Sequence, residues 1–151
     1  MSTQQVAADR RALSHRQIEK LVEDRTEMLS LYSRLASSRP LKGNPAAPAM
    51  LQTFCQLLVD YAADSHFRLY KYIDEKNERR RAVLQIAETI YPKILDSTDV
   101  ILDFNDKYDC GEHCEITDSL EEDLSKLGVA LANRIELEDK LINILINHPK
   151  P

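Results

Sequence analysis

Three residues with metal-binding side chains stand close together in the sequence: Cys110, His113 and Cys114. Thiolate and imidazole groups suit zinc, but no second cysteine or histidine pair follows to complete a four-ligand site. The Glu-x-x-His spacing of di-iron bundles is absent as well, because no histidine stands three residues after a glutamate. These three residues are therefore weak metal candidates, and a surface loop with free thiols is the simpler interpretation.

A second group of chemically active side chains falls on faces that should point into the protein. Arg25 lies on an apolar stripe where a leucine would be expected, and Arg134 and Glu138 lie in the middle of a leucine seam. A buried charge is costly unless it is paired, so we expect these residues to pair with one another or with Asp60 and His66 on a facing helix. Two interpretations stay open. Arg25, His66, Arg134 and Glu138 form a structural polar cluster that fixes helix register, or they line a functional pocket.

Catalytic arrangements are absent from the sequence. There is no glycine-rich phosphate loop and no G-x-S-x-G motif. Cys55 and His66 are eleven residues apart on one expected helix, about 16 Å at 1.5 Å per residue, which is too far for a nucleophile and its base. We therefore expect neither an enzyme nor a cofactor.

One stripe of the second expected helix combines an acid with aromatic side chains. Asp60, Ala63, Phe67 and Tyr70 follow one another at three- and four-residue steps, so they share a helix face. A carboxylate beside an aromatic anchor is typical of a protein–protein hot spot. Packing of Phe67 in the core is the alternative interpretation, and we take the stripe as the candidate partner-binding surface.

Four long amphipathic segments must position these side chains. Apolar residues recur at helical spacing over residues 6–37, 49–76, 83–108 and 120–148, with Pro92 inside the third segment. Proline there either kinks the helix or begins a new one. The last segment follows a strict heptad pattern: Leu120, Leu124, Leu127, Leu131, Arg134, Glu138, Leu141, Leu145 and His148. The sequence predicts an all-α antiparallel four-helix bundle with a short N-terminal extension and a Pro-interrupted third helix.

Composition and charge narrow the class of protein. A chain of 151 residues predicts one domain, residues 1–151, and the absence of a secretory leader and of a long apolar run predicts a cytoplasmic protein without a membrane span. Three cysteines do not make a disulfide framework. A net charge of −5 opposes direct binding to nucleic acid and favours a basic protein partner. We expect a monomer or a weak dimer.

Two separated runs resemble signatures of a known family. Residues 54–66 (FCQLLVDYAADSH), continuing to Phe67 and Tyr70, resemble a signature of the regulator of sigma D (Rsd)/AlgQ family. Residues 134–142 (RIELEDKLI) are similar to its second signature, R-[FI]-x-L-E-D-x-L-I. The resemblance covers most of the chain.

Other positions agree with this resemblance or depart from it. The run IYPKI at residues 90–94 is similar to the family's aromatic-proline step, and FND at residues 104–106, followed by two cysteines, is closer to the AlgQ branch. Arg25, Leu29 and Tyr32 fit the first-helix pattern, which adds Arg25 and Tyr32 to the candidate partner-binding residues. The chain lacks the tryptophan common in that helix, and Ser65 replaces the usual glycine.

The resemblance implies an anti-sigma regulator. Such a bundle binds the C-terminal promoter-reading region of the primary sigma factor, sequesters it from core RNA polymerase and favours alternative sigma factors. An acidic surface suits that partner, because a region that grips DNA is basic. The alternative is a bundle that binds iron or zinc through His66 and Glu138, with or without the Cys110–Cys114 loop. A cytosolic adaptor for another regulator or a phosphocarrier stays open as a third interpretation.

Overall fold

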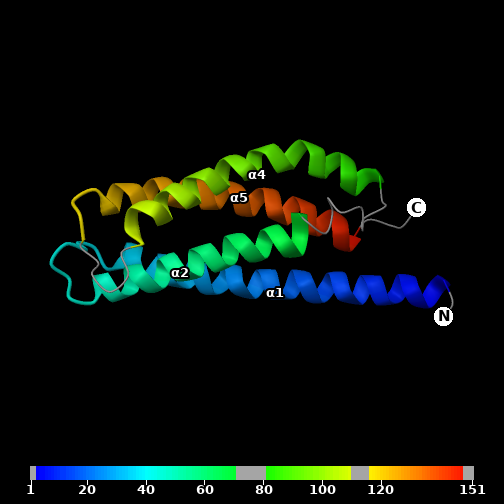
Figure 1. Cartoon of the computed structure of the whole chain (residues 1–151), viewed down its shortest axis with the longest axis horizontal. Coiled ribbons are helices and arrows are strands. Elements are labelled where there is room, and N and C mark those ends of the chain that lie inside the picture. The colour runs from blue at the N-terminus through cyan, green and yellow to red at the C-terminus, as the bar shows by residue number, and fades with distance from the viewer. Residues whose placement is uncertain (1–2, 71–80, 110–115, 148–151) are drawn as a thin grey trace.

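The computed structural model describes residues 3–70, 81–109 and 116–147, which fold into a bundle of long helices. These are α1 (Thr3–Ser37), α2 (Ala47–Ser65), α4 (Arg81–Tyr108) and α5 (Leu120–Asn147), with the short helix η1 (His66–Tyr70) following α2 directly. In Figure 1, α1 and α2 form one layer, α4 and α5 form the other, and successive long helices run in opposite directions. The described residues contain no strand, so the predicted all-α antiparallel bundle is confirmed.

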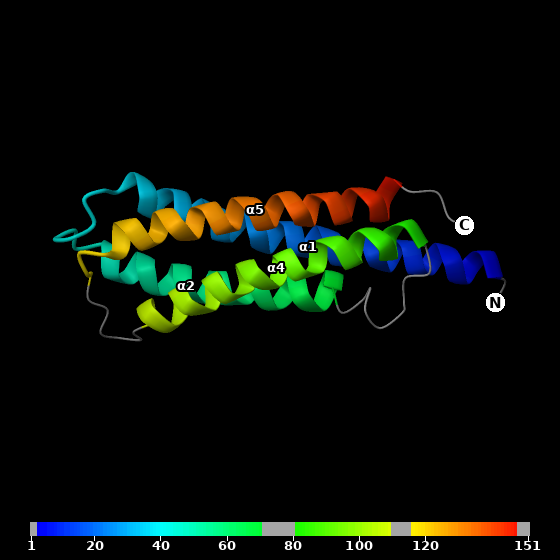
Figure 2. The ribbon, with the colours of Figure 1, turned by 90° about the horizontal axis from the view of Figure 1, so that it is seen from above.

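The four long helices form a closed square. α1 packs along α2, α2 along α4 and α4 along α5, and a lighter contact between α1 and α5 completes the arrangement (Figure 2). α1 and α4 are therefore diagonal to each other. Within the described ranges, no helix carries an apolar stretch long enough to cross a lipid bilayer.

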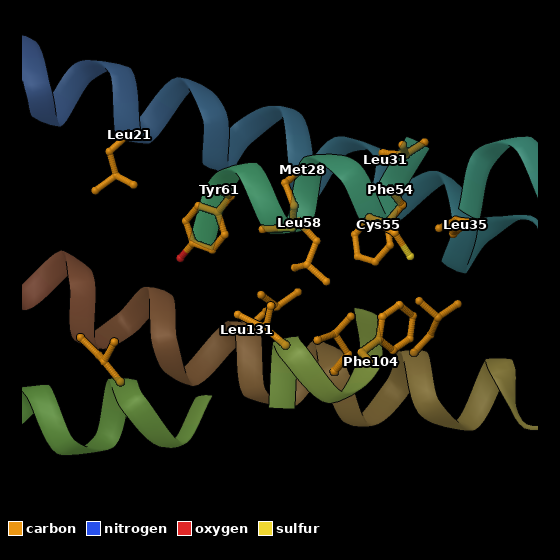
Figure 3. Packing of buried hydrophobic residues seen from close by; sticks show 14 of the residues in the cluster. Leu21, Met28, Leu31, Leu35, Phe54, Cys55, Leu58, Tyr61, Phe104 and Leu131 are labelled. Atoms are coloured by element: carbon orange, nitrogen blue, oxygen red, sulfur yellow. The ribbon is translucent and has the colours of Figure 1, made fainter. Parts of the chain in front are cut away.

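Leucines and aromatic residues from all four long helices fill the core. Met28 of α1, Phe54 of α2, Phe104 of α4 and Leu131 of α5 converge between the two layers (Figure 3). The Phe54 and Phe104 rings meet edge to face with their centroids 5.9 Å apart, a favourable geometry for an aromatic pair. The heptad seam predicted for α5 is confirmed over the described residues, because its eight positions from Leu120 to Leu145 are all buried. The expected ninth position, His148, lies outside the described residues.

The loop between α1 and α2 has local reasons for its path. Gly43 adopts φ +84°, in the left-handed region that favours glycine. The Asn44 side chain accepts a hydrogen bond from the Ala46 amide at 3.0 Å, and Pro48 stands in the first turn of α2, where its missing N–H costs nothing. Lys42 reaches the start of α5 through Asp118, with 2.5 Å between the ammonium and the carboxylate.

Two helix boundaries differ from the prediction, and the structure decides between the two alternatives left open for Pro92. α1 begins at Thr3, earlier than the expected start near residue 6. The second segment changes at Ser65 from α2 to η1, and residues 71–80 are not described. α4 continues through Pro92, so the proline does not begin a new helix. Pro92 and Glu88 are both exposed, and water can serve the carbonyl that loses its intrahelical donor.

η1 is a π-helix, and it sets the orientation of the side chains around it. A π turn takes in more residues than an α turn and so shifts which side chains face the core. Leu69 is buried, Phe67 projects outward, and the Arg68 guanidinium donates to the Gln17 side chain of α1 at 2.5 Å. Asp64 adds an ion pair to Arg68 at 3.5 Å. These contacts fasten η1 to the first helix.

Candidate functional site

A buried polar cluster lies in the middle of the bundle, and Arg134 is its centre. The Arg134 side chain is 1% exposed and that of Glu138 is 0% exposed. One helical turn separates them, and the Arg134 Nε atom lies 3.4 Å from the Glu138 Oε2 atom. The structure thus brings together the two charges that the sequence placed in the α5 seam.

The Arg134 guanidinium donates hydrogen bonds to α4, which lies beside α5, and to α2, which lies diagonally across the bundle. On α4 it reaches the hydroxyls of Ser97 at 3.1 Å and Thr98 at 2.7 Å, and the carbonyl of Ile94 at 3.4 Å. On α2 it reaches the Ser65 hydroxyl at 2.6 Å. A single side chain of α5 therefore ties together three helices, and a planar group with five donors is suited to that task.

Glu138 has its own set of donors. The Tyr61 hydroxyl donates to its Oε1 atom and accepts a hydrogen bond from Arg134 Nε at 3.2 Å. Burial, reinforced by the Glu138 carboxylate, raises the pKa of Tyr61 well above its ordinary value, so the phenol keeps its proton and remains a donor. Figure 3 shows the Tyr61 hydroxyl pointing from α2 toward the α4–α5 layer.

Arg25 joins this cluster from α1. Its Nη1 atom lies 3.6 Å from Glu138 Oε1 and 2.9 Å from the Asp139 Oδ1 atom. The Arg25 side chain is mostly buried, whereas Asp139 is exposed. Three of the four residues predicted for the cluster, Arg25, Arg134 and Glu138, are therefore in contact.

The fourth, His66, requires a correction. Its side chain is exposed, and the buried position on that turn belongs to Ser65. One residue rotates a helical position by about 100°, and here that step takes the side chain from the buried Ser65 position to the exposed His66 position. Asp60, the other expected partner on α2, is exposed and accepts a hydrogen bond from Gln56 at 3.2 Å.

An apolar groove of about 250 Å³ lies above this cluster, between α2 with η1 on one side and α4 on the other. Its walls are mainly apolar and Arg134 forms part of its floor; the lining residues are Val59, Ala62, Ala63, His66, Phe67, Tyr91, Ile94, Leu95, Thr98, Leu102 and Arg134. Phe67 stands at its edge with 59% of its surface exposed. We call this feature the α2–α4 groove.

The predicted partner-binding residues are divided between two faces of the bundle. Ala63 and Phe67 line the α2–α4 groove, and Asp60 precedes them on the exposed side of α2. The side chain of Tyr70 lies outside the described part of the structure. Arg25 and Tyr32 lie instead where α1 meets α5.

Tyr32 holds α1 against α5. Its hydroxyl donates to the Leu124 carbonyl at 2.7 Å, and its ring packs against Phe54. Gly128 makes this approach possible, because a Cβ atom there would lie 2.1 Å from the Tyr32 hydroxyl. Burial raises the pKa of Tyr32 above its ordinary value. Tyr32 thus has a packing partner within the chain.

Sequence reasoning missed several members of the site. Tyr61, Ser65, Ser97 and Thr98 were not among the candidate site residues. Serine and threonine at positions between Ile94 and Ile101, on a face that is otherwise apolar, were the available signal.

The structure gives no support to a metal site among the residues it describes. These residues contain no group of three His, Cys, Asp or Glu side chains that could hold a metal ion. Glu138 is engaged by Tyr61, Arg134 and Arg25, and the His66 side chain is exposed. Residues 110–115, which include the Cys-His-Cys candidates, lie outside the described ranges.

Comparison with known proteins identifies the family. The profile of the family described as "Regulator of RNA polymerase sigma(70) subunit, Rsd/AlgQ" matches residues 1–146. A "Regulator of sigma D" of Yersinia enterocolitica is 32% identical over 136 residues, covering 85% of this chain and 80% of that protein. Its counterpart in Enterobacter sp. (strain 638) is 31% identical over 142 residues, covering 89% of this chain and 83% of that protein. No solved structure gave a significant match.

These matches confirm the resemblance drawn from residues 54–70 and 134–142, both of which lie within the matched region. The chain belongs to the Rsd/AlgQ family of regulators of the RNA polymerase sigma(70) subunit.

Proposed function

We propose that this protein is an anti-sigma regulator that binds the C-terminal promoter-reading region of the primary sigma factor. It acts stoichiometrically in the cytoplasm, without catalysis, and keeps that region from core RNA polymerase so that alternative sigma factors gain access. The whole chain serves as one sigma-binding domain. Family membership supports regulation of sigma(70), and the features below support the binding mode.

The observation that carries this proposal is Phe67 at the edge of the α2–α4 groove. A large aromatic side chain that is 59% exposed beside an apolar hollow is unfavourable in water. An interface anchor gains affinity by filling or bordering such a hollow, where water is then excluded. We assign Phe67, with Ala63 next to it, to the centre of the interface.

The groove is pre-organised by the cluster beneath it. Arg134 joins α2, α4 and α5 through hydrogen bonds, so the two walls of the groove are fixed relative to each other. A rigid groove loses little conformational entropy when a partner enters. The buried charges therefore serve binding indirectly, by holding the surface in shape.

Charge supports the choice of partner. The chain carries a net charge of −5, and Asp60 presents an exposed carboxylate seven residues before Phe67 in the sequence. A helix-turn-helix region that contacts promoter DNA carries lysine and arginine for the phosphates. Opposite potentials steer two such surfaces together and suppress wrong partners.

The test is a titration of the full chain against the isolated C-terminal region of the primary sigma factor. Phe67→Ala should weaken binding about 30-fold, corresponding to about 2 kcal/mol for a hot spot. Val129→Ala is the matched control, because Val129 is 64% exposed on α5 and does not line the groove. Asp60→Asn should weaken binding most at low salt, since screening already reduces the effect of that charge at high salt.

Each variant is first checked by circular dichroism for an intact bundle. If folded Phe67→Ala and Asp60→Asn bind as tightly as the parent chain and Val129→Ala, this face is not the interface and the proposed binding mode is wrong.

A further inference from the structure

The exposed face of α4 continues the α2–α4 groove outward. Leu95 and Leu102 line the groove, yet they are 46% and 47% exposed. They are seven residues apart, so they stand two turns apart on the same side of the helix, about 10.5 Å along its axis. The residues of α4 that fill the core next to them are Ile94, Ile101 and Phe104.

A row of aspartates lies beside these leucines on α4. Asp99, Asp103 and Asp106 follow at four- and three-residue steps, and all three are exposed. At about 100° per residue, their positions fall within about 80° of Leu95 on the side away from the core. We call these three residues the α4 acidic row. Within the described part of the chain they make no ion pair.

The α4 acidic row has an energetic cost to the isolated protein. Like charges four residues apart, such as Asp99 and Asp103, destabilise a helix. Asp106 stands in the last turn of α4, where the helix dipole also disfavours a negative charge. By contrast, a nearby acid, Asp123, forms an ion pair with Lys107, with 2.7 Å between the ammonium and the carboxylate. An acid in this region can therefore have a basic partner within the protein.

Each margin of the groove therefore combines exposed apolar side chains with exposed acids. On the α2 side an exposed aromatic, Phe67, stands near an exposed acid, Asp60. On the α4 side the exposed leucines stand near the α4 acidic row. An apolar trough between two acidic margins is complementary to a helix with an apolar stripe flanked by basic residues.

We propose that α4 forms the second wall of the sigma-binding surface and that its occupant is a basic amphipathic helix lying along α4. This inference rests on the proposed function. The apolar side chains of that helix pack between Phe67 and the pair Leu95 and Leu102. Its lysines or arginines, spaced over two turns, meet the carboxylates of the α4 acidic row.

The experiment compares two variants with the same change of net charge, from −5 to −2. The first replaces the α4 acidic row: Asp99→Asn, Asp103→Asn and Asp106→Asn. The second, a matched control, replaces three exposed acids of α1, diagonal to α4 and outside the groove: Glu19→Gln, Glu23→Gln and Glu27→Gln. Both are titrated against the isolated C-terminal region of the primary sigma factor over a range of salt concentrations.

We expect the α4 variant to bind roughly tenfold more weakly at low salt and to show a flatter salt dependence than the control. A third variant, Leu95→Ala with Leu102→Ala, should weaken binding at all salt concentrations without changing the salt dependence. Binding of the α4 variant equal to that of the α1 control overturns the inference and leaves the proposed function standing. Failure of the unaltered chain to bind overturns the proposed function itself, and this inference with it.

Discussion

Replacing Arg134 by leucine tests the buried cluster most directly. The change removes a guanidinium that donates to Ser65, Ser97 and Thr98 and pairs with Glu138. The three hydroxyls keep other partners: each donates to a backbone carbonyl in its own helix. The main loss is therefore the positive charge beside the Glu138 carboxylate.

The size of the effect follows from what remains around Glu138. Breaking a buried ion pair costs about 3 to 5 kcal/mol, because the other charge is left buried. Glu138 still accepts a hydrogen bond from Tyr61, and its Oε1 atom lies 3.6 Å from Arg25 Nη1. We therefore expect the free energy of unfolding to fall by about 3 kcal/mol, the lower end of that range. In a chain of 151 residues this lowers Tm by about 6 to 12 °C.

Urea and thermal unfolding, followed by circular dichroism, measure this loss. Arg34→Leu is the control, because Arg34 is an exposed arginine on α1. The double variant Arg134→Leu with Glu138→Leu should be much closer to the parent, since it removes both buried charges. If Arg134→Leu unfolds like Arg34→Leu, the side chain faces solvent and the cluster described above does not exist.

Three further outcomes are expected. Gly128→Ala should destabilise the fold by about 1 to 2 kcal/mol in urea unfolding, because the new Cβ would lie 2.1 Å from the Tyr32 hydroxyl. In a Tyr32→Ala background the same change should stabilise, by up to about 1 kcal/mol of helix propensity, and a loss in both backgrounds would contradict this contact. The hydrogen bond from the Lys107 ammonium lowers the pKa of Asp123, so the stability that this contact contributes is present above about pH 4 and is lost as pH falls through the lowered pKa. The Asp123→Asn variant should therefore lose less stability than the parent across this acid range. Parallel profiles of unfolding free energy against pH for the two proteins would refute the contact. Burial raises the pKa of Cys55 to about 12, so at about pH 8 iodoacetamide should modify this thiol only after denaturation. Peptide mass spectrometry measures the modification, and equal rates in folded and denatured chains would show that the thiol is accessible.

Much of the fold could be predicted because it depends on one periodicity. The α5 seam needs only leucines at alternating four- and three-residue steps, and all eight described positions are buried. The change from α2 to η1 at Ser65 could not be predicted in the same way. A π turn is built from the same residue types as an α turn, so the sequence pattern does not distinguish them. Tertiary contacts such as that of Arg68 with Gln17 accompany the change.

The site was only partly predictable for a related reason. An arginine and a glutamate in a leucine seam must be paired, which follows from the cost of burying charge. Their acceptors depend on which helices lie beside α5, and Ser97 and Thr98 are ordinary residues until α4 is placed there. The position of the buried polar residue on α2 was predicted one residue too late, at His66 instead of Ser65. An error of one residue was enough to exchange a buried side chain for an exposed one.

The position of Arg134 also limits how the helices can slide. A seam built only of leucines looks the same after a shift of seven residues, so it would accept several alignments of α5 against its neighbours. Such a shift moves a side chain by about 10.5 Å and would carry the guanidinium away from Ser65, Ser97 and Thr98. Only one alignment satisfies all of its donors. The cluster therefore disfavours bundles in which α5 has slipped along its neighbours, and substitution among the surrounding leucines costs less than substitution of the arginine itself.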